Sequence, residues 1–150
     1  MELQTKSMAE TQNLAEKIAQ AIKRASENQA TVIGLVGDLG SGKTTFTQGF
    51  LKALGVQSSV TSPTFILEKI YPLVGHSFFE RVIHCDLYRL EAETELASLD
   101  FAVIFNNPKN LVLIEWPEKF PSLTKNLSTT INFTFIDETT RQIKYDEKLL

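Results

Sequence analysis

The feature that most constrains the fold is a glycine-rich loop at residues 37–45, which reads Gly-Asp-Leu-Gly-Ser-Gly-Lys-Thr-Thr. It has the form G-x-x-x-x-G-K-[ST], a phosphate-binding loop that is meaningful only between a buried strand and a helix. An apolar, β-branched run at 31–36 precedes it, and apolar residues recur after it at helical spacing. The chain is therefore predicted to contain a strand–loop–helix unit that binds a nucleoside triphosphate.

The residue types within the loop match the parts of a triphosphate. Lys43 would place a positive charge on the β and γ phosphates, and the hydroxyl of Thr44 would be an oxygen ligand for Mg²⁺. The start of the following helix would turn its positive dipole end toward the anion. The predicted nucleotide contacts in this loop are Gly37, Asp38, Leu39, Gly40, Ser41, Gly42, Lys43, Thr44 and Thr45. The alternative is a glycine turn that binds nothing.

The rest of the chain predicts an α/β fold of the P-loop NTPase type, with a mixed, mostly parallel sheet flanked by helices. A helix is expected from Ser7, with a buried face formed by Leu14, Ala15, Ile18, Ile22 and Ala25. Further elements are expected as strands at 65–71, 81–86 and 111–115, a helix at 91–99, and a closing antiparallel hairpin at 130–135 and 141–145. Residues 101–105 fit either a strand or a helix.

Length and composition restrict the class of protein. The 150 residues, of which 43% are hydrophobic, suffice for one compact domain spanning 1–150, ordered apart from its extreme ends. A net charge of −3 gives no basic field for unaided nucleic-acid binding. The single cysteine, Cys85, forms no internal disulfide, and no stretch resembles a signal peptide or membrane span, so a cytoplasmic protein is expected.

Two acids compete to hold Mg²⁺ beside Thr44. Asp86 and Glu115 each end an apolar run, and ligands of open α/β sheets bind at the carboxyl ends of such strands. Glu115 is favoured as the metal acid because the run before it is the more continuous, which leaves Asp86 to orient water or a loop. Each could instead be a solvated acid at a sheet edge.

Other residues carry weaker signals. Thr64 follows Pro63 in a loop that could present a hydroxyl to the γ-phosphate or the attacking water, although Ser, Thr and Pro are also ordinary turn residues. His84 could carry a proton or be structural. Trp116 could pack or respond to nucleotide, and Arg89 could pair with phosphate or with a nearby acid.

Four segments together resemble one family, the bacterial threonylcarbamoyladenosine biosynthesis ATPases, TsaE or YjeE. They are the phosphate loop at 37–45, Val-Thr-Ser-Pro-Thr-Phe at 60–65, His-Cys-Asp-Leu-Tyr-Arg at 84–89 and Ile-Glu-Trp-Pro-Glu at 114–118. Their order and spacing resemble those of the family over nearly the entire chain.

The resemblance implies an ATPase that works with TsaD and TsaB to make threonylcarbamoyladenosine on the tRNA adenosine next to the anticodon. TsaD would carry the group transfer, ATP hydrolysis would drive or reset the complex, and tRNA would be reached only through the partners. By this analogy Lys43, Thr64, Asp86 and Glu115 are catalytic, and Thr44 and Glu115 bind Mg²⁺. Thr11, in a segment at 7–11, and Glu118 would also line the nucleotide pocket.

Other functions remain open from the sequence. A small-molecule kinase normally brings several arginines onto the phosphates, whereas this chain has only Arg24, Arg81, Arg89 and Arg141, without a cluster. A non-enzymatic interaction module could also use nucleotide as a structural ligand without significant hydrolysis. A GTPase switch is disfavoured because no Asn-Lys-x-Asp sequence is present.

Because the chain lacks the Asn-Lys-x-Asp sequence with which GTPases recognise guanine, it is predicted to bind ATP in preference to GTP. In a direct competition for the purified protein, ATP should displace a labelled nucleotide at lower concentration than GTP does. CTP serves as a control for binding through the triphosphate alone. A lower inhibition constant for GTP than for ATP would contradict this prediction.

Overall fold

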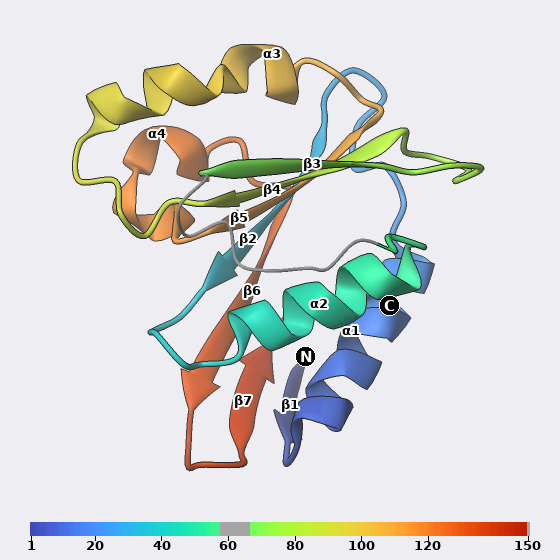
Figure 1. Ribbon diagram of the computed structural model, residues 1–150, viewed down its shortest axis with the longest axis vertical. Helices are drawn as coiled ribbons and strands as arrows, with labels where there is room; N and C mark the ends of the chain where they lie inside the picture. The colour runs from blue at the N-terminus through green and yellow to red at the C-terminus, as the bar shows by residue number, and fades with distance from the viewer. Residues whose placement is uncertain (58–66, 150) are drawn as a thin grey trace.

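The computed structural model describes residues 1–57 and 67–149. Its strands form a seven-stranded sheet in the order β1-β7-β6-β2-β5-β4-β3 (Figure 1). The central strands β6, β2, β5 and β4 are parallel, and β1, β7 and β3 pair antiparallel with their neighbours. The strands are β1 (Glu2–Thr5), β2 (Thr31–Val36), β3 (Glu68–Pro72), β4 (Arg81–Asp86), β5 (Asn110–Glu115), β6 (Thr129–Phe135) and β7 (Arg141–Lys144).

Helices cover both faces of this sheet. Helices α1 and α2 lie on one side, and α3 and α4 lie on the other (Figure 1). Three short 3₁₀ segments complete the described elements. The bounds are α1 (Met8–Ala21), α2 (Lys43–Ala53), η1 (Glu93–Leu99), α3 (Phe101–Phe105), η2 (Pro117–Lys119), α4 (Pro121–Thr124) and η3 (Glu147–Leu149).

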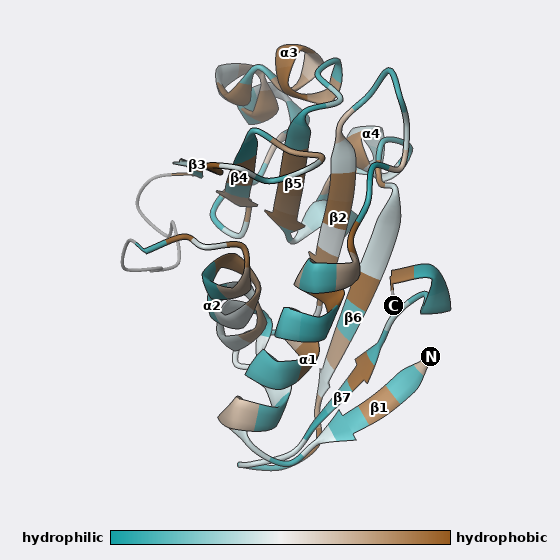
Figure 2. Ribbon diagram, turned by 90° about the vertical axis from the view of Figure 1, so that its right-hand side faces the viewer, coloured by the Kyte–Doolittle hydropathy of each residue, from teal (hydrophilic) through white to brown (hydrophobic). Residues whose placement is uncertain are grey.

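The alternation of side chains along the central strands produces two hydrophobic cores. On β2, Ile33 and Leu35 pack toward α1 and α2, whereas Val32 packs with the core beneath α3 and α4. Both faces of β2 and β5 are thus buried, and these strands are mostly hydrophobic in Figure 2. Burial of both faces is typical of the parallel centre of an α/β sheet, whose crossover helices cover both sides.

Much of the predicted architecture is confirmed. The mixed, mostly parallel sheet and the closing β6–β7 hairpin are present, and β4 has the predicted bounds. Ser7 caps α1, with its side chain accepting a hydrogen bond from the Glu10 backbone N–H. The ambiguous segment at 101–105 is helical, and the predicted helix at 91–99 is the 3₁₀ segment η1.

Three details differ from the predictions. Helix α1 ends at Ala21, so Ala25 is exposed rather than buried, and its N–H instead bonds the hydroxyl of Thr31. The described part of β3 begins at Glu68, after a bend at Leu67. The N-terminal end is ordered as β1, which pairs with β7 although its Leu3 stays 45% exposed.

None of the helices within 1–57 and 67–149 has the length and apolar character needed to cross a membrane.

A close approach of two helices fixes the orientation of the phosphate-loop helix. A Cβ placed on Gly49 of α2 would lie 2.8 Å from Cα and 2.9 Å from the carbonyl oxygen of Gln12 in α1. The obstruction is backbone, which cannot rotate away as a side chain can. Only glycine therefore allows α2 to pack against α1 at this distance.

The substitution Gly49→Ala should destabilise the protein by about 1–3 kcal/mol despite the better helix propensity of alanine, because the two helices must separate. Chemical denaturation measures this change. Lys52→Ala, at an exposed position of the same helix, is the matched control and should shift the free energy of unfolding by less than about 0.5 kcal/mol. A Gly49→Ala variant as stable as wild type would contradict the steric argument.

Candidate nucleotide-binding site

A cavity of about 850 Å³ lies where β4 and β5 end and α2 begins. This is the carboxyl edge of the parallel strands, at which ligands of open α/β sheets bind. Its described lining comes from four parts of the chain: the phosphate loop with the start of α2, the ends of β4 and β5 with the residues after them, the segment leading into α1, and the β6–β7 turn.

The phosphate loop depends on glycine at its first and last turns. Gly37 has a φ of 149°, and a Cβ there would lie 2.4 Å from the carbonyl oxygen of Phe133. Gly42 has a φ of 106° in the left-handed region and forms the N-cap of α2, which begins at Lys43. The helix therefore directs its positive N-terminal end at the cavity, as an anion site requires.

Lys43 is held inside the site by its own loop. Its ammonium donates hydrogen bonds to the carbonyl oxygens of Gly37 and Asp38, the latter at 2.9 Å. Burial lowers the pKa of this ammonium, and the carboxylates of Glu115, Glu118, Asp86 and Asp38 oppose that shift. A cation largely removed from water favours the binding of an anionic group beside it, because water no longer screens its charge.

The indole of Trp116 covers this lysine. The Lys43 ammonium lies 4.3 Å from the ring centroid, within the range of a cation–π contact. Trp116 also packs against Tyr88, with ring centroids 5.2 Å apart, and both residues line the cavity. Trp116 has a φ of 63°, a conformation uncommon for a non-glycine residue, which places its ring directly after the end of β5.

Asp86 and Glu115 meet at the strand ends, as the parallel pairing predicts. They are register partners on β4 and β5, both line the cavity, and they are 7% and 3% exposed. Asp86 Oδ1 accepts a hydrogen bond from the Tyr88 backbone N–H at 3.0 Å, and Glu115 Oε1 lies 2.8 Å from His84 Nε2. Neither acid has the exposure of a solvated acid at a sheet edge.

The cavity contains two side chains that could hold a magnesium ion together with a nucleotide. No group of three or more His, Cys, Asp or Glu side chains within 1–57 and 67–149 is arranged to hold a metal. Thr44 and Glu115, the two predicted ligands, line the same cavity. Mg²⁺ is commonly held by one or two protein oxygens together with substrate phosphates and water, and these two side chains could supply that protein share.

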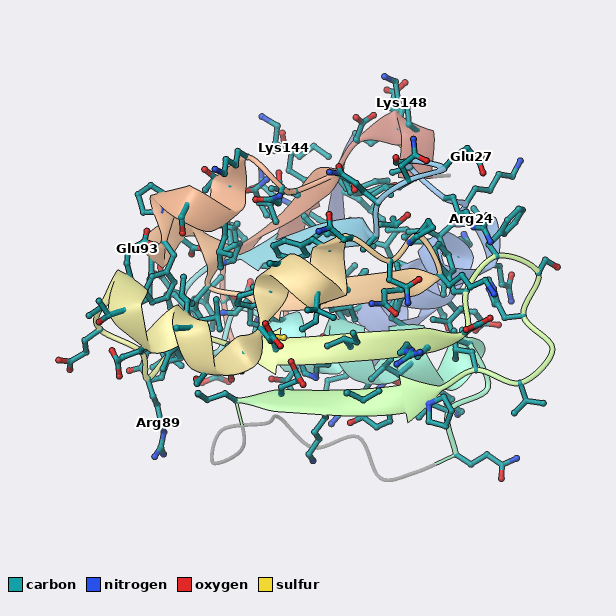
Figure 3. All side chains as sticks on the ribbon, turned by 90° about the horizontal axis from the view of Figure 1, so that it is seen from above. Arg24, Glu27, Arg89, Glu93, Lys144 and Lys148 are labelled. Atoms are coloured by element: carbon teal, nitrogen blue, oxygen red, sulfur yellow. The ribbon has the colours of Figure 1, made fainter. Side chains whose placement is uncertain are left out.

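The other predicted nucleotide contacts occupy different places. Leu39, Gly40, Gly42, Thr45 and Thr11 line the cavity, whereas Gly37, Asp38, Ser41 and Glu118 are not in its lining. Thr11 is buried with its hydroxyl 2.8 Å from that of Thr5. Thr64 lies outside the described residues. Arg89 does not line the cavity, and its side chain extends outward from the molecule (Figure 3).

The sequence interpretation missed the turn between β6 and β7. Glu138, Thr139 and Arg141 line the cavity, although the hairpin was predicted only to close the sheet. Arg141 reaches the phosphate loop, where its Nε donates to the carbonyl oxygen of Gly40 at 3.1 Å. The sequence places Arg141 about a hundred residues from the loop, and only the pairing order of the sheet brings the two together.

Comparison with known proteins supports the predicted resemblance. The family model described as "Threonylcarbamoyl adenosine biosynthesis protein TsaE" matches residues 5–143. The chain belongs to the TsaE family. All described residues that line the cavity, from Lys6 to Arg141, fall within the match.

Several curated TsaE proteins and one solved structure are similar to the chain. The tRNA threonylcarbamoyladenosine biosynthesis protein TsaE of Haemophilus influenzae is 34% identical over 81% of this chain and 74% of its own length. The TsaE protein of Aquifex aeolicus is 33% identical over 95% and 92%. The crystal structure of YdiB from Bacillus subtilis covers 97% of this chain and 83% of its own, with a TM-score of 0.64 and 24% identity, and shows a shared fold.

The position of Trp116 in this TsaE protein predicts an optical signal. Saturating ADP should change its fluorescence, because phosphates beside Lys43 would alter the charge that faces the indole. The chain has a single tryptophan, so the emission has one source. Titration of wild type with ADP measures the change, and CMP is the control for a weakly bound nucleotide. An emission spectrum that stays constant while calorimetry reports ADP binding would contradict the prediction that the bound nucleotide lies near the indole of Trp116.

Proposed function

We propose that this TsaE-family protein is a Mg²⁺-dependent cytoplasmic ATPase that acts with TsaD and TsaB in threonylcarbamoyladenosine modification of tRNA. The observation that carries the proposal is that one cavity is lined by Lys43 and Thr44 together with Asp86 and Glu115, which end two neighbouring parallel strands. A phosphate loop alone serves many reactions, whereas this combination supplies parts for both binding and hydrolysis.

The proposed binding step uses groups that the chain already orients. Backbone N–H groups at the start of α2 would receive the phosphates, and the Lys43 ammonium would exchange its contacts with Gly37 and Asp38 for phosphate oxygens. Thr44 and Glu115 would hold the magnesium ion, which when bound neutralises charge on the β and γ phosphates. Trp116 would shield this end of the cavity from water.

The proposed hydrolytic step assigns the remaining polar groups. Asp86 would orient the attacking water, directly or by holding the turn that its carboxylate already caps at Tyr88. The hydroxyl of Thr64 remains a predicted contact to the γ-phosphate or to that water. Correct placement of water demands close geometric control, so a partner that adjusts these groups could raise turnover strongly.

The proposed partners follow from family membership and charge. The curated relatives are named as tRNA threonylcarbamoyladenosine biosynthesis proteins. The resemblance of this chain to their family implies TsaD and TsaB as partners. A net charge of −3 offers little for direct tRNA binding, so tRNA would be reached through the complex. ATP hydrolysis would drive or reset that complex while TsaD performs the group transfer.

Substitution of the phosphate-loop lysine tests this function. Lys43→Ala should lower ATP turnover in the presence of TsaD and TsaB by about 100-fold or more, because it removes a positive charge from the transferring phosphate. Formation of modified tRNA should fall with it. Phosphate release and nucleoside analysis of the tRNA measure the two effects, and wild type should hydrolyse ATP faster with the partners than alone.

Lys52→Ala is the matched control because Lys52 is an exposed lysine of the same helix, and it should retain full activity. Equal tRNA modification by wild type and Lys43→Ala would refute the ATPase proposal. If ADP still bound wild type in that case, the outcome would instead identify an interaction module that uses nucleotide as a structural ligand.

A further inference from the structure

A buried histidine lies against the proposed metal acid. His84 and Asp86 are two residues apart on β4 and therefore share a face of that strand, while Glu115 is the register partner of Asp86 on β5. The Glu115 side chain turns back along the sheet so that its Oε1 lies 2.8 Å from His84 Nε2. The two side chains are only 1% and 4% exposed. The contact is thus shielded from water.

The surroundings of the imidazole determine which nitrogen carries the proton. The other ring nitrogen, Nδ1, is buried and has no hydrogen-bond partner among the described residues. A proton on Nδ1 would leave an unpaired buried donor and turn the Nε2 lone pair toward a carboxylate oxygen, and both arrangements are costly. A proton on Nε2 avoids both problems. His84 therefore donates through Nε2 to Glu115 Oε1.

This donation restrains a flexible side chain at the point where its orientation matters. A glutamate reaches its carboxylate through three rotatable bonds, and burial alone does not select one rotation. Because His84 engages Oε1 while Glu115 lines the cavity, Oε2 is the oxygen best placed to face a ligand there. Carboxylates that hold metal ions are commonly oriented in this way by a hydrogen-bonded neighbour.

We propose that His84 is a positioning residue that orients the Glu115 carboxylate for magnesium–nucleotide binding. This inference rests on the proposed magnesium role of Glu115. The competing explanation is a buried polar pair that only joins β4 to β5. The two explanations differ in what removal of the donor does: a positioning role predicts a loss specific to nucleotide binding with magnesium, whereas a joining role predicts a loss of stability alone.

Calorimetric titration with ADP, in excess Mg²⁺ and in EDTA, tests the proposal. The measured quantity is the ratio of the ADP affinity with Mg²⁺ to the ADP affinity in EDTA. In His84→Leu this ratio should be about 10- to 100-fold smaller than in wild type, the usual cost of losing such an orienting partner. The ADP affinity in EDTA should stay within about twofold of wild type, since no phosphate-loop group is changed. His84→Gln should retain most of the magnesium-dependent gain, because its amide nitrogen is as many bonds from Cα as Nε2.

His84→Asn is the matched control, because its shorter amide matches the position of Nδ1 and cannot reach Glu115. If the leucine variant fails to fold, the contrast between glutamine and asparagine, with melting temperatures measured for both, provides the same test. In a Glu115→Ala background, His84→Leu should cost no further magnesium-dependent affinity.

A full magnesium-dependent gain in folded His84→Leu, or equal gains in the glutamine and asparagine variants, would overturn the positioning role while leaving the proposed function intact. Wild-type protein that binds ADP equally well with Mg²⁺ and with EDTA would instead refute the magnesium site itself, and the role of His84 with it.

Discussion

The close contact between Gly37 and the neighbouring strand β6 is the constraint on which the site depends. With the Phe133 carbonyl oxygen 2.4 Å from where a Cβ would stand, the chain can leave β2 in this direction only at glycine. That exit sets the path of the phosphate loop and the start of α2 at Lys43. The position of the lysine, and therefore the charge at the centre of the cavity, follows from a strand pairing in the middle of the sheet.

The contacts of Lys43 are of a kind that the proposed nucleotide binding could replace. Four carboxylates act on the ammonium, yet its hydrogen bonds go to two backbone carbonyls of its own loop. Carbonyl oxygens are neutral acceptors and give way to phosphate more readily than a directly paired carboxylate would. Within residues 1–57 and 67–149 the cation is buried and oriented without a salt bridge, so a nucleotide bound as proposed would not first have to break one.

The local parts of the fold and its sheet class could be predicted from the sequence, whereas several specific long-range contacts could not. The phosphate loop, the strand at 81–86 and the acids at two strand ends have short signals in residue type and spacing, and all three lie where parallel pairing requires. Strand β1 has no such signal, because its four residues bury only Thr5 and derive their order from β7. The same reason hides Arg141, which reaches Gly40 only once the sheet has formed.

The bond between His84 and Glu115 illustrates a second limit. From the sequence, a histidine in an apolar strand could carry a proton or be structural, and its partner was not apparent. The contact requires the parallel register of β4 and β5 and a particular rotation of the glutamate, neither of which is encoded locally. Side-chain pairs that bridge separate strands depend on that register, whereas motifs within one loop do not.

The pairing of the first and last strands has a consequence for synthesis of the protein. The segment between β1 and α1 and the turn between β6 and β7 both line the cavity. They are brought together because β1 pairs with β7 at one edge of the sheet. The ribosome must therefore release β7 before these two walls can come together. If the cavity binds nucleotide as proposed, the nucleotide could not assist early folding of the nascent chain by binding a finished pocket. The central strands must first be stabilised by their own hydrophobic contacts.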